Sequence, residues 1–220
     1  MSRLKEKIVY IIREIIIVAI GVLFAFFISN TSKSINERKR EKIVILDLLD
    51  DIRYNIEQTD RTINESNEYL EMCTNTVSLL KTGHFSIDSL PYVLPALTRD
   101  YSTQINSTTY ESIKNTGELS LIRDKEIRRR IVEYYVHAKD VRRAESAYSR
   151  VSTDARNYIN DNIEIINIRN HPIEILDSRE FYNTFYSAMM YTSIRQEYYN
   201  IFLNKSTSVA ELINNYFELL

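Results

Sequence analysis

Residues that break helices are rare in this chain. Its 220 residues include three glycines and three prolines, and long stretches contain neither. The tight turns of a protein with many β-strands need glycine, proline or Asn-Gly pairs for their backbone angles. The sequence therefore predicts an all-α protein built from a few long helices.

The helix breakers also divide the chain into segments. They are Gly21, Gly83, Pro91, Pro95, Gly117 and Pro172. The intervals predict long helices over about 34–82, 125–168 and 178–218, and short helices over about 89–98 and 107–117. Each long helix is on the order of 65 to 75 Å, and matched lengths favour an antiparallel bundle. The short pieces form either a broken fourth helix or a distal cap, so the bundle has three or four helices.

Polar residues stand where these helices are expected to begin. Asp124 is a good N-cap for the helix over 125–168, and Gly117 is expected to end the short helix before it. The spacing of a capping box occurs in two pairs, Thr108 with Glu111 and Asp177 with Glu180.

A coiled-coil-like seam runs along the first long helix, with spacings that alternate between four and three. Its members are Ile45, Leu49, Ile52, Ile56, Thr59, Ile63, Ser66, Leu70, Cys73, Val77 and Leu80. The polar Thr59 and Ser66 weaken this seam and are expected to fix its register. The inner faces of the other two long helices are marked by Ile127, Ile131, Tyr134, Ala138, Val141, Tyr148, Val151, Ala155, Ile159 and Ile163, and by Phe181, Phe185, Tyr199, Phe202, Val209 and Ile213.

The stretch "REIIIVAIGVLFAFFISN", residues 13–30, is apolar or Gly from Ile15 to Ile28. Extended back to Ile8, it is long enough to cross a bilayer. A cleaved leader would need small residues at its end, where this run has bulky ones, and a buried helix of a soluble domain would need a polar face. We therefore expect an uncleaved transmembrane helix over 8–30, after a basic tail at 1–7 and before the bundle at 31–220. No breaker separates it from the first bundle helix, so the span and that helix are expected to form one rod of roughly 110 Å.

The orientation in the membrane is harder to predict, because basic residues flank the span on both sides. Arg3, Lys5, Lys7 and Arg13 precede its apolar part, and Lys33, Arg38, Lys39, Arg40 and Lys42 follow. A short basic tail resists translocation, which favours a cytoplasmic tail and an extracytoplasmic bundle. Gly21 and Ala25 have the spacing that lets two spans pack closely, although small residues are common in such helices.

One carboxylate pair is a candidate for metal binding. Asp47 and Asp51 lie one helical turn apart and, with oxygens from a facing helix, would suit a divalent cation. A solvated helix surface near the membrane is the simpler explanation, because no second acidic motif of this kind recurs. His84, His137 and His171 fall in no metal-binding pattern, and no phosphate loop or nucleophile motif is present. No catalytic residue and no cofactor is therefore expected.

Tyrosine is frequent in the last two long helices. The candidates for a core, a cleft or a partner-binding face are Tyr134, Tyr135, Tyr182, Tyr186, Tyr191, Tyr198 and Tyr199. Tyrosine serves either purpose, because it combines apolar area with a hydroxyl. The basic cluster at Arg128–Arg130 would meet anionic headgroups if its helix end lies near the membrane; otherwise it is a solvated face.

Two stretches resemble a family of uncharacterised bacterial single-pass membrane proteins, a domain of unknown function. "REIIIVAIGVLFAFFISN", followed by "NERKREKIVILDLLDDI", is similar to that family's opening, and "YESIKNTGELSLIRDKEIRRRIVEYY" to a later segment. The chain departs from the family at Arg13, where Gly often stands, and in lacking an Asn-rich, Trp-containing exit from the span. The resemblance implies a bacterial membrane protein with a helical extramembrane domain, and it assigns no catalytic residue.

These features together predict a protein that acts by binding, as an adaptor, scaffold or sensor subunit in the bacterial cytoplasmic membrane. Its expected partners are the lipid bilayer and a second copy or another membrane or envelope protein. Nucleic acid is not expected, because the formal net charge is only -2. Two alternatives remain: a membrane-permeabilising effector whose span oligomerises, and a metal-dependent enzyme that uses Asp47 and Asp51.

Overall fold

The computed structural model describes residues 2–82, 88, 94, 101–163 and 178–218 of the chain, and this part is all-α. Its elements are α1 (Ser2–Lys81), α3 (Thr108–Asn115), the 3₁₀ helix η2 (Glu118–Leu121), α4 (Lys125–Asn162) and α5 (Arg179–Glu218). No strand occurs among these residues, which confirms the predicted fold class.

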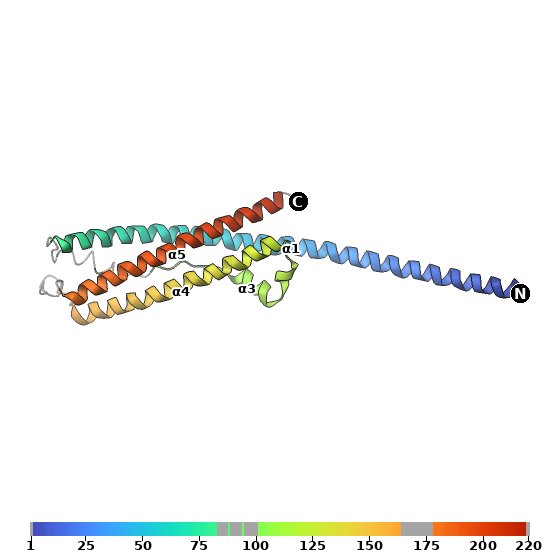
Figure 1. Cartoon of the computed structure of the whole chain (residues 1–220), viewed down its shortest axis with the longest axis horizontal. Coiled ribbons are helices and arrows are strands. Elements are labelled where there is room, and N and C mark those ends of the chain that lie inside the picture. The colour runs from blue at the N-terminus through green and yellow to red at the C-terminus, as the bar shows by residue number, and fades with distance from the viewer. Residues whose placement is uncertain (1, 83–87, 89–93, 95–100, 164–177, 219–220) are drawn as a thin grey trace.

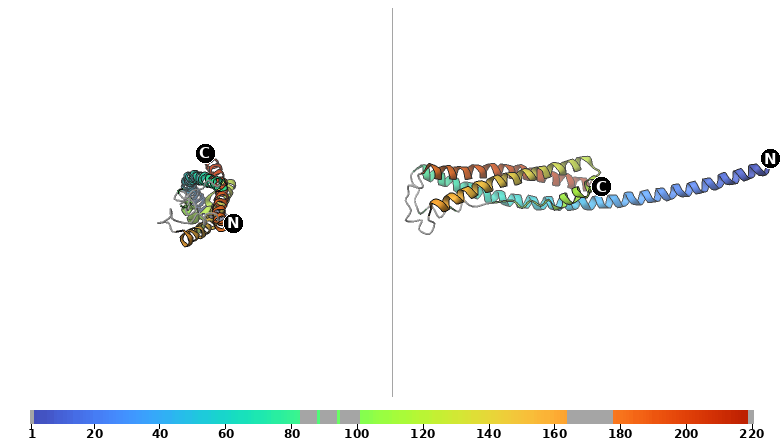
Figure 2. Two further views of the ribbon diagram at one scale, coloured as in Figure 1. Left: turned by 90° about the vertical axis from the view of Figure 1, so that its left-hand side faces the viewer. Right: turned by 90° about the horizontal axis from the view of Figure 1, so that it is seen from below.

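The three long helices form an elongated bundle from which the N-terminal half of α1 projects alone (Figure 1). Helix α5 packs against both α1 and α4 and runs antiparallel to each of them. Helices α1 and α4 run in the same direction, so the chain returns along the bundle between them (Figures 1 and 2). The predicted continuity is confirmed, because α1 is a single helix of 80 residues from the apolar stretch to the end of the bundle.

Residues 101–107, which we call the extended segment, lie between the parallel helices α1 and α4. Tyr101, Thr103 and Ile105 are buried and alternate with exposed Ser102 and Gln104. This segment is held from both sides, since Asn55 of α1 donates a hydrogen bond to the carbonyl of Asn106 and Arg142 of α4 donates one to that of Ile105. The described bundle is thus three long helices closed by an extended strand-like segment. The short helix predicted over 89–98 lies outside the described residues, except for Leu94.

The predicted core positions are confirmed wherever the structure describes their side chains. Every such member of the α1 seam is buried or half-buried, and so are the predicted inner residues of α4 and α5. A second row on α1 is also buried, because this helix contacts α5 on one side and the extended segment on the other. The residues of this row are Val44, Leu48, Asn55, Thr62, Tyr69 and Thr76.

The predicted start of α4 is confirmed, its predicted end needs correction, and the start of α5 is capped by Ser178. The Oδ1 atom of Asp124 accepts hydrogen bonds from the backbone N–H groups of Glu126 and Ile127, at 2.8 and 2.9 Å. Helix α4 ends at Asn162 rather than at 168, because Ile163 turns to an extended backbone and its side chain is buried in the core. At the start of α5, Ser178 Oγ accepts from the N–H of Phe181 at 3.1 Å and takes the capping role assigned to Asp177, which lies outside the described residues.

The capping box predicted for α3 is wrong. Thr108 is already helical, the N-cap position belongs to Ser107, and no side-chain bond from Ser107 caps the helix. Asn106 Oδ1 accepts from the N–H of Thr108 at 3.0 Å instead. After α3, Gly117 has φ of +77°, a left-handed conformation that glycine adopts without strain, and the predicted end of this helix is confirmed.

Candidate functional site

One helix among the described residues is long and apolar enough to cross a membrane, and it is α1. We call residues 8–30 the candidate span. Its described apolar side chains are all exposed in the single chain, on every side of the helix: Ile16, Ile17, Val18, Ile20, Val22, Leu23, Phe24, Phe26, Phe27 and Ile28. This part of α1 projects away from the bundle (Figure 1), so the described part of the protein does not cover it.

Gly21 and Ala25 are both exposed on the candidate span. A Cβ atom added at Gly21 would meet nothing within 4 Å, so no contact inside the described chain requires a glycine there. A role in packing two spans together therefore stays a prediction.

The two aspartates of the proposed carboxylate pair differ in burial and in hydrogen bonding. Asp51 is half-buried and holds the start of α3: its Oδ2 accepts from the N–H of Thr109 at 3.2 Å, and its Oδ1 accepts from the side-chain amide of Asn106 at 2.7 Å. Asp47 is exposed to solvent. Asp51 is thus a long-range helix cap, a role that sequence reasoning missed because the capped helix begins 57 residues later in the chain.

The described residues contain no cluster of three or more His, Cys, Asp and Glu side chains suited to a metal ion. His137 lies near Asp140, with 3.9 Å between Nδ1 and Oδ2, on the surface of α4. His84 and His171 lie outside the described residues. The carboxylate pair therefore has no third ligand of these types in the part of the chain that the structure describes.

A buried arginine, Arg195, was not expected from the sequence. Its side chain is 0% exposed, its guanidinium carbon lies 3.7 Å from the ring centroid of Tyr148, and its Nη1 donates a hydrogen bond to the carbonyl of Tyr101. Nearby, Glu145 accepts from the Tyr199 hydroxyl at 2.8 Å and from the N–H of Thr103 at 2.7 Å. The signal was present in the spacing, since Arg195 follows Thr192 by three residues and precedes Tyr199 by four, which places it on the inner face of α5.

This polar layer lies between two apolar clusters of the core. One cluster gathers side chains such as Ile45, Ile131 and Phe202, and the other gathers Tyr69, Phe181 and Phe185. Arg195 belongs to neither cluster and bridges α5 to the extended segment through Tyr101. We interpret it as a structural group that ties the connection after α1 to the rest of the bundle.

The predicted tyrosines divide into two groups. Tyr134, Tyr135 and Tyr199 are buried, whereas Tyr182, Tyr186 and Tyr198 are exposed, with Tyr191 between these extremes. The exposed group belongs to an apolar row of α5, which we call the α5 outer face: Tyr182, Tyr186, Met190, Ile194, Tyr198 and Ile201. At 3.6 residues per turn these side chains centre on the side of α5 opposite its buried residues.

The α5 outer face is also poor in charge. Between Phe181 and Asn204 the only charged residues are Arg195, which is buried, and Glu197. Large apolar side chains that cluster on an exposed surface are typical of sites where another molecule binds. Tyrosine and methionine are also enriched in such interfaces.

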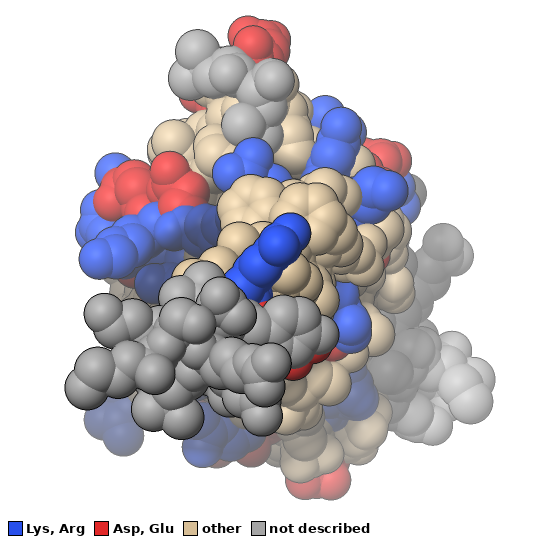
Figure 3. Space-filling model, turned by 90° about the vertical axis from the view of Figure 1, so that its right-hand side faces the viewer, with Lys and Arg blue, Asp and Glu red and all other residues tan. Residues whose placement is uncertain are grey.

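The basic cluster of α4 lies at the end of the bundle from which the candidate span leaves. At this end, ion pairs link α1 to the chain before α4: Arg40 pairs with Glu118, and Glu37 pairs with Arg123. Lys and Arg side chains gather on this end of the molecule (Figure 3). The cluster therefore lies next to the candidate span, which is the position that it needs in order to meet anionic headgroups.

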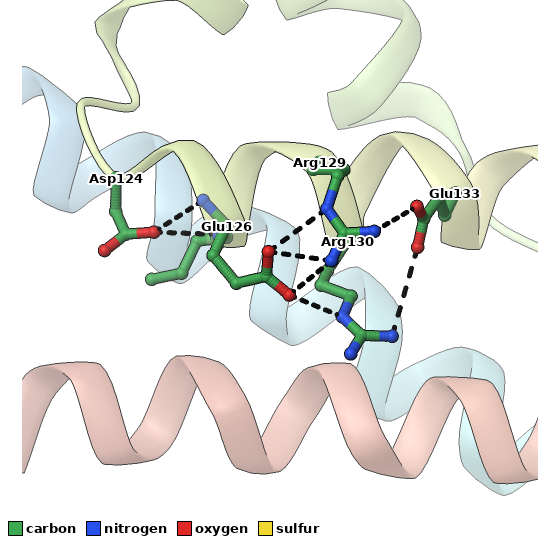
Figure 4. A network of polar contacts seen from close by, with 6 residues as sticks. Asp124, Glu126, Arg129, Arg130 and Glu133 are labelled. Atoms are coloured by element: carbon green, nitrogen blue, oxygen red, sulfur yellow. Dashed lines mark hydrogen bonds and ion pairs between the residues drawn. The ribbon is translucent and has the colours of Figure 1, made fainter.

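Two of the three clustered arginines are already paired with carboxylates (Figure 4). Glu126 lies 2.7 Å from Arg129 and 2.9 Å from Arg130, and Glu133 lies 2.8 Å from Arg129. Hydrogen bonds from Arg129 and then Arg130 hold the pKa of the Glu126 carboxyl below its usual value. The local charge of this cluster is thus largely balanced at the surface.

Comparisons with protein families, with curated proteins and with solved structures find no match to this chain. The resemblance to the uncharacterised bacterial family stays a prediction.

Proposed function

We propose that this protein is a membrane-anchored helical bundle that works by binding another protein, as an adaptor, scaffold or sensor subunit, and not by catalysis. The observation that carries this proposal is the α5 outer face. Six large apolar side chains are exposed there over 20 residues, on the side of α5 away from the core. Burying such a face against a partner removes apolar area from water, which is the main favourable term in protein association.

The partner that this face fits best is a second copy of the chain. A two-fold interface places the same surface of both copies in contact, and this face carries a single exposed charge, Glu197, so its self-pairing brings few like charges together. Two copies anchored in one membrane would also be held side by side with their bundles parallel, which raises their effective concentration. Another membrane or envelope protein with an apolar helix would be recognised by the same surface.

We place the protein in the bacterial cytoplasmic membrane, crossing it once, with the bundle outside the cytoplasm. The support for this placement is the exposed candidate span, the short basic tail before it and the family resemblance.

Cysteine cross-linking in membranes tests the proposed interface. Met190→Cys in a Cys73→Ala background should form a disulfide-linked dimer on mild oxidation, because position 190 lies near the two-fold axis of the proposed pair. Adding Tyr186→Glu and Ile194→Glu should abolish the dimer, since these carboxylates would be buried face to face.

A cysteine at exposed Thr153 on α4 is the matched control and should give little dimer. Equal cross-linking at positions 153 and 190, or a Met190→Cys dimer that survives both glutamates, would reject self-association through α5. A Met190→Cys adduct to a different protein, lost on adding the same two glutamates, would support a heterologous partner.

A further inference from the structure

A cavity of about 860 Å³ opens between α1 and the last turns of α5, at the end of the bundle near the candidate span. Its apolar wall is formed by Ile45, Leu46, Leu49, Tyr216 and Phe217. Sites for small ligands are typically about 300 to 1,000 Å³ and are lined by apolar and aromatic side chains with a few polar groups. This cavity has both the size and the lining of such a site.

The rim of the cavity on the α1 side carries uncompensated positive charge. Arg38, Lys39 and Lys42 line it and form no ion pair with any described residue, whereas Arg123 pairs with Glu37 and Arg53 with Asp50. The ammonium of Lys42 lies 5.9 Å from the ring centroid of Phe217, where the cationic rim meets the aromatic wall. The one acidic residue of the lining, Glu41, is already used, because it accepts a hydrogen bond from the N–H of Arg123 at 2.6 Å.

The cavity begins close to the membrane surface expected from the sequence. Arg38 follows the end of the candidate span by eight residues, or about 12 Å of helix. The Cα–Cβ bonds of a helix tilt toward its N-terminus, so the long basic side chains of α1 lean back toward the span. A molecule leaving the outer part of the bilayer would meet these cations first and the apolar wall behind them.

We propose that this cavity binds an anionic amphiphile with a single hydrocarbon chain, of the kind that a bilayer supplies. The carboxylate or phosphate of the ligand lies on Arg38, Lys39 and Lys42, and its chain lies along Leu46, Leu49 and Phe217. The ligand needs both an anionic group and a hydrocarbon chain, because a free anion would leave the apolar wall unused and a neutral chain would leave the cations unused. This site is separate from the α5 outer face and does not depend on the proposed dimer.

Photo-cross-linking tests this site in the full chain, reconstituted in nanodiscs of zwitterionic phosphatidylcholine. The probe is palmitic acid with a diazirine in its chain, and mass spectrometry locates the cross-link. We expect labelling of the peptides that contain Leu46, Leu49 or Phe217. Unlabelled palmitate should compete, whereas hexadecanol, which lacks the charge, and inorganic phosphate, which lacks the chain, should not.

Two pairs of variants separate this site from general contact with lipid. Leu46→Glu should remove the labelling, whereas Ile43→Glu, on an exposed apolar residue of α1 outside the cavity, should leave it unchanged. The double variant Arg38→Ala/Lys42→Ala should weaken labelling about tenfold or more, and Arg61→Ala/Lys81→Ala, at exposed positions far along α1, should not.

The proposal is overturned if the label is confined to residues 8–30, if hexadecanol competes as well as palmitate, or if Ile43→Glu acts like Leu46→Glu. Competition by inorganic phosphate would also overturn it and would indicate a site for a free anion. Dimer formation through Met190→Cys, measured in the same nanodiscs, shows separately whether the proposed partner interface holds.

Discussion

Arg195 shows how a single residue can join parts of the chain that are far apart in sequence. Its guanidinium is buried away from water, and its positive charge is stabilised by the rings of Tyr148 and Tyr199 and by the carbonyl of Tyr101. A desolvated cation over an aromatic ring contributes about 2 kcal/mol, and a bond to a charged donor about 1.5 to 3 kcal/mol. Arg195 therefore anchors the extended segment to α5, in addition to the bonds that Asn55 of α1 and Arg142 of α4 make to it.

Arg195→Ala should lower the free energy of unfolding by about 3 kcal/mol, because it leaves a cavity and a buried carbonyl without its donor. Arg195→Met should cost less, since its side chain fills more of the space. Urea unfolding of the full chain in a neutral detergent, followed by circular dichroism, measures both. An alanine variant as stable as the wild type would show that Arg195 is not a structural anchor.

Buried tyrosines make the fold sensitive to alkali. Burial raises the pKa of Tyr134 to about 12 from an ordinary value of 10.0, although the hydrogen bond from Asn55 opposes the shift. The folded state then holds this proton more tightly than the unfolded state does. The stabilisation is complete below pH 10 and is lost as the pH rises toward 12.

Tyr134→Phe should reduce the loss of stability between pH 10 and 12, because phenylalanine has no proton to release. The free energy of unfolding measured across this range tests the expectation, with Tyr182→Phe at an exposed position as the control. The same loss in Tyr134→Phe as in wild type would assign the alkaline transition to other groups.

At the scale of elements, α3 depends on a side chain from α1. Eight residues are too few for an isolated helix to be stable in water, so α3 needs its caps and its buried Tyr110 and Ile113. Asp51 satisfies the N–H of Thr109 and orients Asn106, which in turn satisfies the N–H of Thr108. The carboxylate thus replaces the local capping box that the sequence suggested.

Asp51→Ala should cost about 1 kcal/mol of stability and raise amide hydrogen exchange over 108–115, because a cap and an oriented amide are lost. Asp47→Ala, one turn earlier and exposed, should change stability by less than about 0.5 kcal/mol. Both are measured in the presence of a chelator. The measurement is then repeated with added Mg²⁺. If both substitutions lowered stability equally, and only when Mg²⁺ was present, the alternative in which the pair binds a metal ion would be supported.

At the scale of the whole molecule, α1 couples the candidate span to the bundle. The same helix carries the exposed apolar residues of the span and, after Glu41, the buried seam of the core. No flexible linker interrupts it, so a tilt or rotation of the bundle would be transmitted to the span.

The orientation of this rod is tested by labelling a cysteine at the far end of the bundle. Asn160→Cys, exposed near the end of α4, in a Cys73→Ala background should react with a membrane-impermeant maleimide in intact cells. Without the Cys73→Ala change the background should still be low, because Cys73 is fully buried and burial raises the pKa of its thiol to about 11. Labelling only after lysis would place the bundle in the cytoplasm and overturn the proposed orientation.

Local patterns were sufficient for the long helices and their inner faces. The absence of breakers between Gly21 and Gly83 is a property of consecutive residues, and so is the seam from Ile45 to Val77. The N-cap at Asp124 was equally predictable, because an aspartate bonds N–H groups only two and three residues ahead. Such contacts are short in sequence and follow from helix geometry alone.

The arrangement of the connections came only from the tertiary structure. The cap that Asp51 provides to α3, the anchoring of Tyr101 by Arg195 and the early end of α4 at Asn162 all join residues through space. The spacing of residues along the sequence does not show which distant segments will pack against one another.

The sequence by itself thus determined an all-α chain with an apolar N-terminal helix that continues into a bundle, because periodicity and helix breakers act locally. Only the tertiary structure decided that α1 and α4 are parallel, that an extended segment closes the space between them, and which tyrosines stay exposed on α5. It also decided where the cavity between α1 and the end of α5 lies. These features depend on which faces the packing covers, and that is set by contacts between residues distant in the chain.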